Sequence, residues 1–369
     1  MSDLQAPSGR ARPGDLLLAI ASRFPACAAG PVHISALGDG LINHSYRVES
    51  TAGAFVLQRI NGSVFPAPAR IMDNLAALQA AAAAHPELGV RLPALAAADD
   101  GLPYARDDDG EYWRLMECIE PSRTLKRLDT ASQATEVGRV LGSFHRLGAT
   151  LGPDALAVTL PGFHHTPGYL AALDGTLANA RLDAETAAAV AFIEAHRALA
   201  GLLEDAQAKG LTHQRVIHGD PKLDNLLFDT DGERAICLID LDTVQPGLVH
   251  HDMGDCLRSC CNRGGEAGSS SVRFDLALCE ALLAGYAEAA GDLLSAPELE
   301  LVAPAIRLIP LELAIRFLTD HLQGDRYFRV RHRGENLLKA RRQLALLADI
   351  ERQQAAIDAA VRAAFARAY

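Results

Sequence analysis

The sequence predicts an α+β fold in which a small, β-rich half precedes a larger, mainly helical half. Between residues 32 and 60, short runs of alternating apolar and polar residues are separated by glycine-containing turns, the pattern of antiparallel strands. After residue 131, most apolar residues recur at helical spacing instead. Such segregation of strands from helices along the chain is typical of the α+β class.

Each expected element follows from its local periodicity and its turn residues. The first half is expected to hold a helix over residues 15–22, a three-strand meander over 32–60, a helix over 66–85 and a strand over 111–116. The second half is expected to hold helices over residues 132–147, 184–208, 274–290 and 298–369. The exception is the stretch 216–244, where two apolar strands flank a polar turn at 229–232.

The same pattern divides the chain into three parts. Residues 1–14 are mostly polar and rich in Pro, Gly, Ser and Arg, which predicts a flexible leader that lacks the apolar core of a signal peptide. Residues 15–117 then form an N-terminal lobe and residues 118–369 a C-terminal lobe. The hinge between the lobes is expected within residues 117–123.

Composition and charge narrow the expected partners. The 369 residues are 49% hydrophobic and 22% charged, which is ordinary for a globular protein. A formal net charge of −11 argues against a nucleic acid or an anionic membrane as partner, because those surfaces need clustered Lys and Arg. No apolar stretch reaches the length of about 20 residues that a membrane-spanning helix needs. The expected partners are therefore small molecules, and the composition specifies no oligomeric state.

The cysteines indicate a reducing compartment. Seven cysteines form an odd number without regular spacing, so we expect free thiols in a cytoplasmic protein. The one dense patch of possible metal ligands comprises His250, His251, Cys256, Cys260 and Cys261. It lacks the paired CxxC spacing of structural zinc sites, so buried thiols are expected there rather than a metal centre.

Residues that carry chemistry are concentrated in the strand-containing part of the second half. Residues 218–225 read HGDPKLDN, and residues 239–243 read IDLDT. Phosphoryl transfer needs a carboxylate that holds the acceptor hydroxyl in line, and hard oxygen ligands that hold Mg²⁺ on the nucleotide phosphates. Asp220 can supply the first and Asn225 the second. A hairpin would return the chain so that Asp240 lies beside Asn225 as another metal ligand.

Two other interpretations of these segments must be weighed. A polar turn between buried strands would explain single Asp and Asn residues, but not the ordered set of His218, Asp220 and Asn225 followed by a later Asp. The run 239–243 also resembles the nucleophile motif of haloacid-dehalogenase-type phosphatases, in which Asp240 would be phosphorylated. That fold needs alternating strands and helices after the motif, whereas this chain turns helical.

A glycine-containing turn in the first half is a candidate nucleotide-binding flap. Gly38, Asp39 and Gly40 precede Asn43 and Ser45, which lie at the start of an expected strand. A dinucleotide-binding fingerprint would open a helix instead, and the chain contains no GxxxxGK[ST] P-loop. Between two strands, backbone N–H groups of such a turn can approach phosphates, although a plain hairpin turn has the same sequence.

The HGDPKLDN and IDLDT segments resemble the HGDxxxxN and ID motifs of aminoglycoside phosphotransferases and choline kinases. The resemblance implies a two-lobed, protein-kinase-like fold, transfer of a phosphoryl group from ATP to an alcohol, and Mg²⁺ as cofactor. Further blocks resemble the N-acetylhexosamine 1-kinases, namely residues 38–46, 55–61, 241–247, 252–255 and 316–328. This narrower resemblance implies an anomeric hydroxyl of N-acetylglucosamine or N-acetylgalactosamine as acceptor, with Arg316 and Tyr327 contacting the sugar.

Roles follow for the remaining candidate residues. Lys222 is expected to add positive charge near the γ-phosphate and to lie at the substrate, and Asp242 is a further candidate metal ligand. His218 is expected to brace its loop by hydrogen bonding rather than to act as a base. The hinge backbone that would bind adenine comprises Met116, Glu117 and Cys118.

Three departures from the family pattern bear on these roles. Leu41 stands where the family commonly has His, so the exact sugar is left open, and Gly219 stands where it often has Asn. The strand Lys that usually binds the α- and β-phosphates is replaced by Gln58. Because neighbouring side chains of a strand point to opposite faces, we expect the adjacent Arg59 to contact the nucleotide instead.

Other acceptors and an inactive alternative stay open at this stage. A kinase of the same fold could act on another sugar, an amino alcohol or an aminoglycoside. A catalytically inactive, kinase-like binding module is the third class of protein to consider. The joint presence of Asp220, Asn225 and Asp240 argues against it, since a module without catalysis has no need to keep the three together.

Overall fold

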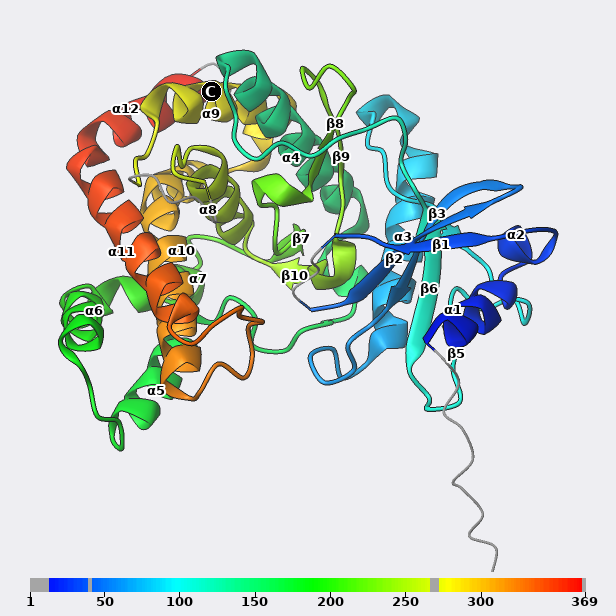
Figure 1. Cartoon of the computed structure of the whole chain (residues 1–369). Helices are drawn as coiled ribbons and strands as arrows, with labels where there is room; N and C mark the ends of the chain where they lie inside the picture. The colour runs from blue at the N-terminus through cyan, green and yellow to red at the C-terminus, as the bar shows by residue number, and fades with distance from the viewer. Residues whose placement is uncertain (1–12, 39–41, 266–271, 367–369) are drawn as a thin grey trace, which may run out of the picture. The chain divides into compact units, whose positions relative to one another are not determined.

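The computed structural model describes residues 13–38, 42–265 and 272–366 and confirms the α+β class (Figure 1). By its internal contacts, the chain divides into two compact units: Met1–Met72 with Pro93–Ile119, and Asp73–Leu92 with Glu120–Tyr369. The predicted lobe boundary at residues 117 and 118 lies close to the division after Ile119. The segment 73–92, however, packs with the second unit, and most of the predicted leader lies outside the described residues.

The first unit is an antiparallel sheet with two short helices against one face (Figure 1). Its strands are β1 (His33–Ala36), β2 (His44–Ser50), β3 (Gly53–Arg59), β4 (Leu95–Ala96), β5 (Ala105–Arg106) and β6 (Tyr112–Glu117). The strand order is β1-β2-β3-β6-β4, and β5 also pairs with β6. The helices α1 (Pro13–Ser22) and α2 (Pro25–Ala28) bury Phe24 against Leu57 and Trp113 of the sheet. The predicted first helix, meander and following strand are thus present in this unit.

The division between the units falls within α3 (Pro68–Ala84), the predicted alanine-rich helix. The second unit is mainly helical. Its helices are α4 (Ala131–Leu151), α5 (Thr166–Leu177), α6 (Ala184–Ala195), α7 (Leu202–Ala208), α8 (Val249–Cys260), α9 (Leu276–Ala290), α10 (Ala296–Leu322), α11 (Glu335–Arg352) and α12 (Gln354–Phe365). Its 3₁₀ segments are η1 (Pro86–Leu88), η2 (Pro153–Ala155), η3 (Arg197–Gly201), η4 (Leu223–Asn225), η5 (Leu241–Thr243) and η6 (Gly291–Leu293).

Two small antiparallel sheets lie among these helices. β7 (Arg215–Ile217) pairs with β10 (Gln245–Gly247), and β8 (Leu226–Phe228) pairs with β9 (Ala235–Leu238). The hairpin predicted around residues 229–232 is therefore present as β8 and β9. The loop 218–225 leads from β7 into that hairpin, and α8 follows directly after β10. Every residue of α8 is buried, and the loop 218–225 packs against this helix.

Two long predicted helices are broken in the structure. The stretch 184–208 forms α6, η3 and α7, because His196 Nδ1 bonds to Phe192 O at 2.7 Å and competes with the helical hydrogen bonds where α6 ends. The described part of the stretch 298–369, which ends at residue 366, forms α10, α11 and α12. Gly324 (φ 94°) and Gly334 (φ 91°) adopt left-handed backbone conformations in the connection between α10 and α11, which ends the helical path there.

α4 and α9 pack closely because glycines lie at their contact. A Cβ atom on Gly138 would lie 2.0 Å from Leu282 O, and one on Gly285 would lie 2.1 Å from Thr135 O. Around α10, a second contact layer buries Leu311, Ile315 and Leu318 against α5, α6 and α11. Among the described residues, no single helix is both long and apolar enough to cross a membrane, although α6 and the bent segment after it meet that test jointly.

Candidate active site

The loop between β7 and β8 is anchored by one buried carboxylate. Asp252 on α8 accepts hydrogen bonds from the backbone amides of His218 (2.6 Å) and Gly219 (2.8 Å). The same carboxylate lies 2.9 Å from His145 Nε2. Burial would raise the pKa of Asp252, but His145 and these contacts outweigh it and hold the pKa below its ordinary value. The backbone that leads into Asp220 is therefore fixed by a charged group beneath it.

Only glycine fits immediately before Asp220. Gly219 has a φ of 86°, and a Cβ atom there would lie 2.8 Å from Thr243 O. His218 Nδ1 accepts the amide hydrogen of Asp220 at 3.2 Å, and His218 Nε2 donates to Ile239 O at 3.0 Å. Burial lowers the pKa of His218, so the ring is neutral and has one donor and one acceptor nitrogen, as these contacts require.

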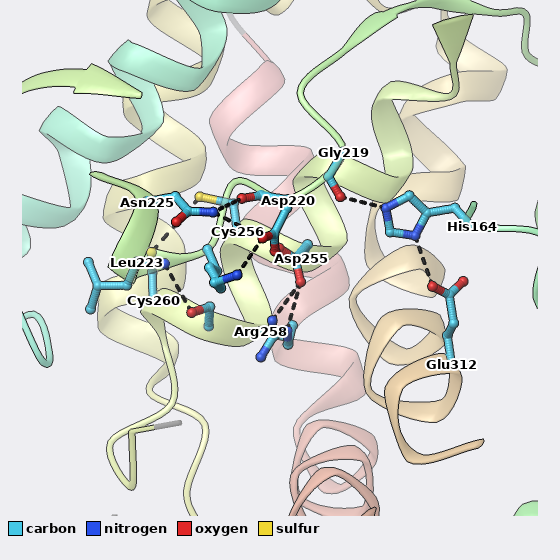
Figure 2. Close-up of polar contacts among 12 residues, drawn as sticks. His164, Gly219, Asp220, Leu223, Asn225, Asp255, Cys256, Arg258, Cys260 and Glu312 are labelled. Carbon is cyan, nitrogen blue, oxygen red and sulfur yellow. Dashed lines mark hydrogen bonds and ion pairs between the residues drawn. The ribbon is translucent and has the colours of Figure 1, made fainter. Parts of the chain in front are cut away.

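The Asp220 carboxylate is held by two side chains of its own loop. Lys222 Nζ donates to Asp220 Oδ2. Asn225 Nδ2 donates to the same Oδ2 at 3.0 Å and to Asp220 O at 2.8 Å (Figure 2). Burial acts to raise the pKa of Asp220, but Lys222 outweighs it and the pKa is lowered. For Lys222, burial acts to lower the pKa, and the charges of Asp220 and Asp240 raise it on balance. Asp220 is thus an ionised acceptor of protons at neutral pH.

Asn225 and Asp240 meet at the base of the β8–β9 hairpin. Ile239 N donates to Asn225 O at 2.9 Å, so Asp240 follows directly beside Asn225. Asp240 has a left-handed backbone conformation (φ 65°) and an exposed side chain, whereas Asp242 is buried with 2% exposure. The structure therefore brings Asp220, Asn225 and Asp240 together, with Asp242 close by in η5.

These oxygen donors fit a magnesium ion. Both donor hydrogens of Asn225 face Asp220, which leaves its Oδ1 as the atom that can ligate a metal. Mg²⁺ prefers oxygen ligands and is usually held by one or two side chains together with phosphates and water. Among the described residues there is no group of three or more His, Cys, Asp and Glu side chains that could hold a metal, and this includes the patch from His250 to Cys261.

A second charged pair lies under the loop. Asp255 on α8 accepts from Arg258 Nε at 2.9 Å and Nη2 at 2.7 Å, and both side chains are buried (Figure 2). Burial raises the pKa of Asp255 to about 6, and the charge of Asp220 acts in the same direction. The sequence motif 252–255 contained both Asp252 and Asp255, yet its pattern assigned no role to either.

Arg316 on α10 lies inside a group of aromatic rings in the second unit. Its guanidinium carbon lies 5.0 Å from the ring centre of Tyr169, 5.4 Å from Phe163, 5.5 Å from Phe328 and 6.0 Å from Tyr327. Such distances are those of cation–π contacts. Burial acts to lower the pKa of Arg316, but neighbouring Tyr and acidic groups, Asp220 among them, raise it on balance. The guanidinium of Arg316 is therefore a permanent cation.

Tyr327 is 44% exposed, so its ring is available to a ligand at this aromatic group. The loop that carries it is fixed by Asp320 on α10, which accepts the backbone amides of Arg326 (2.7 Å), Tyr327 (2.8 Å) and Phe328 (2.9 Å). No sequence pattern predicts these three contacts, because a carboxylate near the end of a helix can accept from many different backbone amides.

In the first unit, the sheet places Gln58 and Arg59 on opposite faces. Arg59 pairs in register with Trp113 and is on the face that packs against α1 and α2. Gln58 instead donates to Ser45 Oγ at 2.8 Å and accepts from Arg114 Nε at 3.0 Å on the other face. The cation that accompanies Gln58 is therefore Arg114 on β6, which the sequence analysis did not single out.

Other predicted nucleotide contacts lie at the ends of these strands. Asn43 Oδ1 accepts from Asn61 N at 3.0 Å, and Gly38 has a left-handed φ of 67°, whereas Asp39 and Gly40 lie outside the described residues. Beyond Met116, the amide of Glu117 donates to Ala94 O and that of Cys118 to Ala54 O. Adenine contacts at these two residues would therefore have to use their carbonyl groups.

Comparisons with known proteins agree with this geometry. A family model described as the phosphotransferase enzyme family matches residues 33–296. The solved structure of a microcompartment-associated aminopropanol kinase has a TM-score of 0.65 at 18% identity, covering 94% of this chain and 98% of that one. A spectinomycin phosphotransferase solved with ADP and spectinomycin has a TM-score of 0.58 at 13% identity, with 91% and 98% covered. A choline kinase from Cryptosporidium parvum Iowa II has a TM-score of 0.57 at 13% identity, with 92% and 96% covered.

The likeness to these structures, over nearly all of the chain, confirms the two-lobed, protein-kinase-like fold class. The phosphatase alternative finds no support, because Asp240 follows an antiparallel hairpin rather than a strand of an alternating α/β sheet. The family match covers well over half of the chain and includes the whole loop 218–225. The chain is a phosphotransferase and belongs to the phosphotransferase enzyme family.

Proposed function

We propose that this phosphotransferase moves the γ-phosphoryl group of ATP to the anomeric hydroxyl of a free N-acetylhexosamine, N-acetylglucosamine or N-acetylgalactosamine. The convergence of Asp220, Asn225 and Asp240 on one point of the second unit is the observation that carries the kinase chemistry. The contacts of Arg316 with four aromatic rings support the choice of acceptor.

The catalytic loop supports a role for Asp220 in orienting the acceptor. Its carboxylate is ionised, partly exposed at 27% and held by Lys222 and Asn225, so it can accept a hydrogen bond from the hydroxyl and then its proton. Lys222 lies at the same carboxylate and would offset negative charge from the transferred phosphoryl group. Asn225 and Asp240 would hold Mg²⁺, which neutralises charge on the triphosphate when bound.

The aromatic group around Arg316 favours an uncharged acceptor. Aromatic rings that recognise an amino alcohol leave their faces open for the ligand's own cation. Here a guanidinium of the chain already lies within 6.0 Å of four rings, so an ammonium group would meet a like charge. A neutral sugar can instead accept hydrogen bonds from the guanidinium and stack on Tyr327.

The decisive experiment is a screen of ADP release with MgATP across free hexosamines, hexoses, choline-like alcohols and aminoglycosides. We expect the highest kcat/KM with N-acetylglucosamine or N-acetylgalactosamine, and a product whose phosphate is attached to the anomeric carbon by ³¹P NMR. A highest kcat/KM for choline, ethanolamine or an aminoglycoside would contradict the proposal.

A matched pair of variants links the result to the aromatic group. Arg316→Lys keeps the charge but not the planar fork of donors, and Arg316→Gln removes the charge. We expect both variants to raise the KM for the hexosamine by about tenfold or more while leaving the KM for ATP near its wild-type value. A cationic acceptor that gains kcat/KM in Arg316→Gln would show that the guanidinium sets acceptor charge.

A further inference from the structure

His164 contacts the catalytic loop from outside it. It lies just before α5, with a left-handed backbone conformation (φ 58°) and a buried side chain. Its Nε2 is 2.7 Å from Gly219 O, and its Nδ1 is 2.9 Å from Glu312 Oε1 on α10 (Figure 2). The sequence motifs did not include His164 or Glu312, and the chemistry described above does not use either residue.

The two partners of His164 fix its protonation state. A backbone carbonyl oxygen can only accept, so Nε2 must carry a hydrogen. Burial would raise the pKa of Glu312, but His164 outweighs it and brings the pKa to about 2, so this carboxylate also accepts. Both ring nitrogens of His164 are therefore donors, and the ring is an imidazolium. Thr166 Oγ1 donates to the other oxygen of Glu312 at 2.7 Å, which completes the carboxylate's contacts.

The peptide bond between Gly219 and Asp220 is thus held at both ends. His164 donates to its oxygen at 2.7 Å, and His218 accepts from its nitrogen at 3.2 Å. This arrangement requires a charged His164 ring and a neutral His218 ring. Despite its burial, the pKa of His164 is raised by Glu312, and the pKa of His218 is lowered by burial. Rotation of this peptide unit would turn the Asp220 side chain away from the acceptor, so the two rings fix the direction of the carboxylate.

Glu312 also connects His164 to the aromatic group. Arg316 lies one turn further along α10, and its Nη1 is 3.9 Å from Glu312 Oε1. One buried carboxylate therefore contacts both the guanidinium of Arg316 and the imidazolium beside the loop 218–225. A displacement of Arg316 by an acceptor would act on the same carboxylate that positions Asp220.

We propose that His164, held by Glu312, is a positioning residue that clamps the Gly219–Asp220 peptide and couples it to Arg316. The proposal rests on the role proposed for Asp220. Without the clamp, Asp220 would still be present and ionised, but its carboxylate would point in the productive direction for a smaller fraction of the time. The expected loss is therefore in kcat, with little change in nucleotide binding.

The proposal also predicts a pH dependence. Burial acts to lower the pKa of His164, but Glu312, Gly219 O and Asp255 outweigh it and raise the pKa above its ordinary value. Charged or titratable groups that face this ring are Glu312 and Arg316 on α10, and Asp255 and His251 on α8. The parallel ring of His251, 4.7 Å away, has a pKa lowered to about 3 and stays neutral. The ion pair between His164 and Glu312 is present below the raised pKa and is lost as the pH rises through it. The neutral ring carries one N–H and can donate to only one of its two partners, so the clamp loosens and kcat should fall on the alkaline side.

The test compares His164→Asn and His164→Gln with wild type. Asn tolerates the left-handed backbone but is too short to reach Gly219 O, whereas Gln keeps a neutral donor. We expect kcat to fall by about 100-fold in His164→Asn, by less in His164→Gln, and the alkaline decrease of kcat to disappear in both. The KM for ATP should stay within about twofold of wild type. A kcat within twofold of wild type in His164→Asn, or an unchanged alkaline limb, would overturn the proposal.

A matched control is His196→Gln. His196 also lies between a backbone oxygen, Phe192 O at 2.7 Å, and a carboxylate, Glu351 at 3.1 Å, but it has no contact with the loop. We expect its kcat and pH profile to match wild type, even if thermal stability falls as much as in the His164 variants.

A second readout is independent of the acceptor. Nitrogen shifts of the His164 ring, assigned with His164→Gln, should show both nitrogens protonated at neutral pH and one deprotonated in Glu312→Gln. Kinetics are measured with the best acceptor of the screen, so a failure with hexosamines alone would overturn the proposed function and leave this proposal standing. A neutral His164 ring in the wild-type protein would overturn the clamp whatever the acceptor.

Discussion

Asp320 fixes the loop that carries Tyr327 by accepting three of its backbone amides, and the side chain of Asn336 on α11 donates to the same carboxylate. Each hydrogen bond to a charged acceptor contributes about 1.5 to 3 kcal/mol to the free energy of unfolding. The position of the exposed Tyr327 ring therefore depends on the buried carboxylate of Asp320.

Asp320→Ala is expected to weaken acceptor binding rather than nucleotide binding. The loop 326–328 would lose its anchor, and the ring of Tyr327 would no longer be held over Arg316. We expect the KM for the acceptor to rise by about tenfold, with the KM for ATP unchanged. Asp183→Ala, which removes a carboxylate that caps α6, is the control and should change only stability. Equal acceptor KM values in the two variants would exclude this role.

At this scale, spacing in the sequence was enough to find residues whose partners are near in the chain. Asp220, Lys222 and Asn225 lie within one loop, and the hairpin that brings Asp240 to them follows from a polar turn between apolar runs. Asp252, His164 and Glu312 hold the same loop from other elements, and no local pattern identifies such contacts. Arg59 shows a different difficulty, since strand alternation alone does not say which face a helix covers.

Among the elements, α4 and α9 depend on a close approach of their backbones. Gly138→Ala would place a Cβ atom 2.0 Å from Leu282 O. Because that oxygen belongs to the backbone, no side-chain rotation can relieve the clash. We expect a loss of unfolding free energy of about 2 kcal/mol or more, measured by denaturant titration. Gly175→Ala on α5 is the control, because a Cβ atom there has no neighbour within 4 Å and should stabilise the helix slightly. Similar unfolding free energies for the two variants would show that α4 and α9 can move apart without a loss of stability.

The start of α10 supplies a pH-dependent contribution to stability. Burial would raise the pKa of Glu298, but Arg215 and the amide and hydroxyl of Ser295 outweigh it and lower the pKa from 4.5 to about 2. A folded-state pKa below the unfolded value stabilises the protein above pH 4.5 and ceases to do so as the pH falls towards 2.

Glu298→Gln should therefore cost roughly 3 kcal/mol of unfolding free energy at neutral pH and much less near pH 2.5. Unfolding free energies of wild type and variant across that range measure the difference. Glu300→Gln, at an exposed position two residues along the same helix, is the control. A difference between Glu298→Gln and wild type that does not shrink in acid would contradict the assignment.

Helices and strands were predictable where periodicity is strong, and their ends were not. The meander of the first unit was recognised from alternation and glycine turns. The breaks after α6 and α10 depend on a side chain that bonds to the backbone and on left-handed glycines, and neither changes the apolar spacing of its neighbours. The helix α8 was not predicted, because its buried residues include His, Asp, Arg and Ser side chains, which a search for apolar spacing does not count.

At the scale of the whole molecule, each unit has its own core and its own polar site. The first unit aligns Ser45, Gln58 and Arg114 on one face of its sheet, and the second brings Asp220, Asn225 and Asp240 to one loop and hairpin. The phosphotransferase family match, residues 33–296, includes both of these groups of residues. We propose that Asp220 acts on the acceptor, whereas the nucleotide is bound by other residues.

Asp220→Asn tests that claim most directly. Asn keeps the size of the side chain and removes the charge that accepts the proton. We predict that turnover of the best acceptor falls by about 10³-fold or more, while the dissociation constant of MgATP, measured by calorimetry, stays within about threefold of wild type. Turnover close to wild type, or a loss of MgATP binding that matches the loss of turnover, would contradict the account.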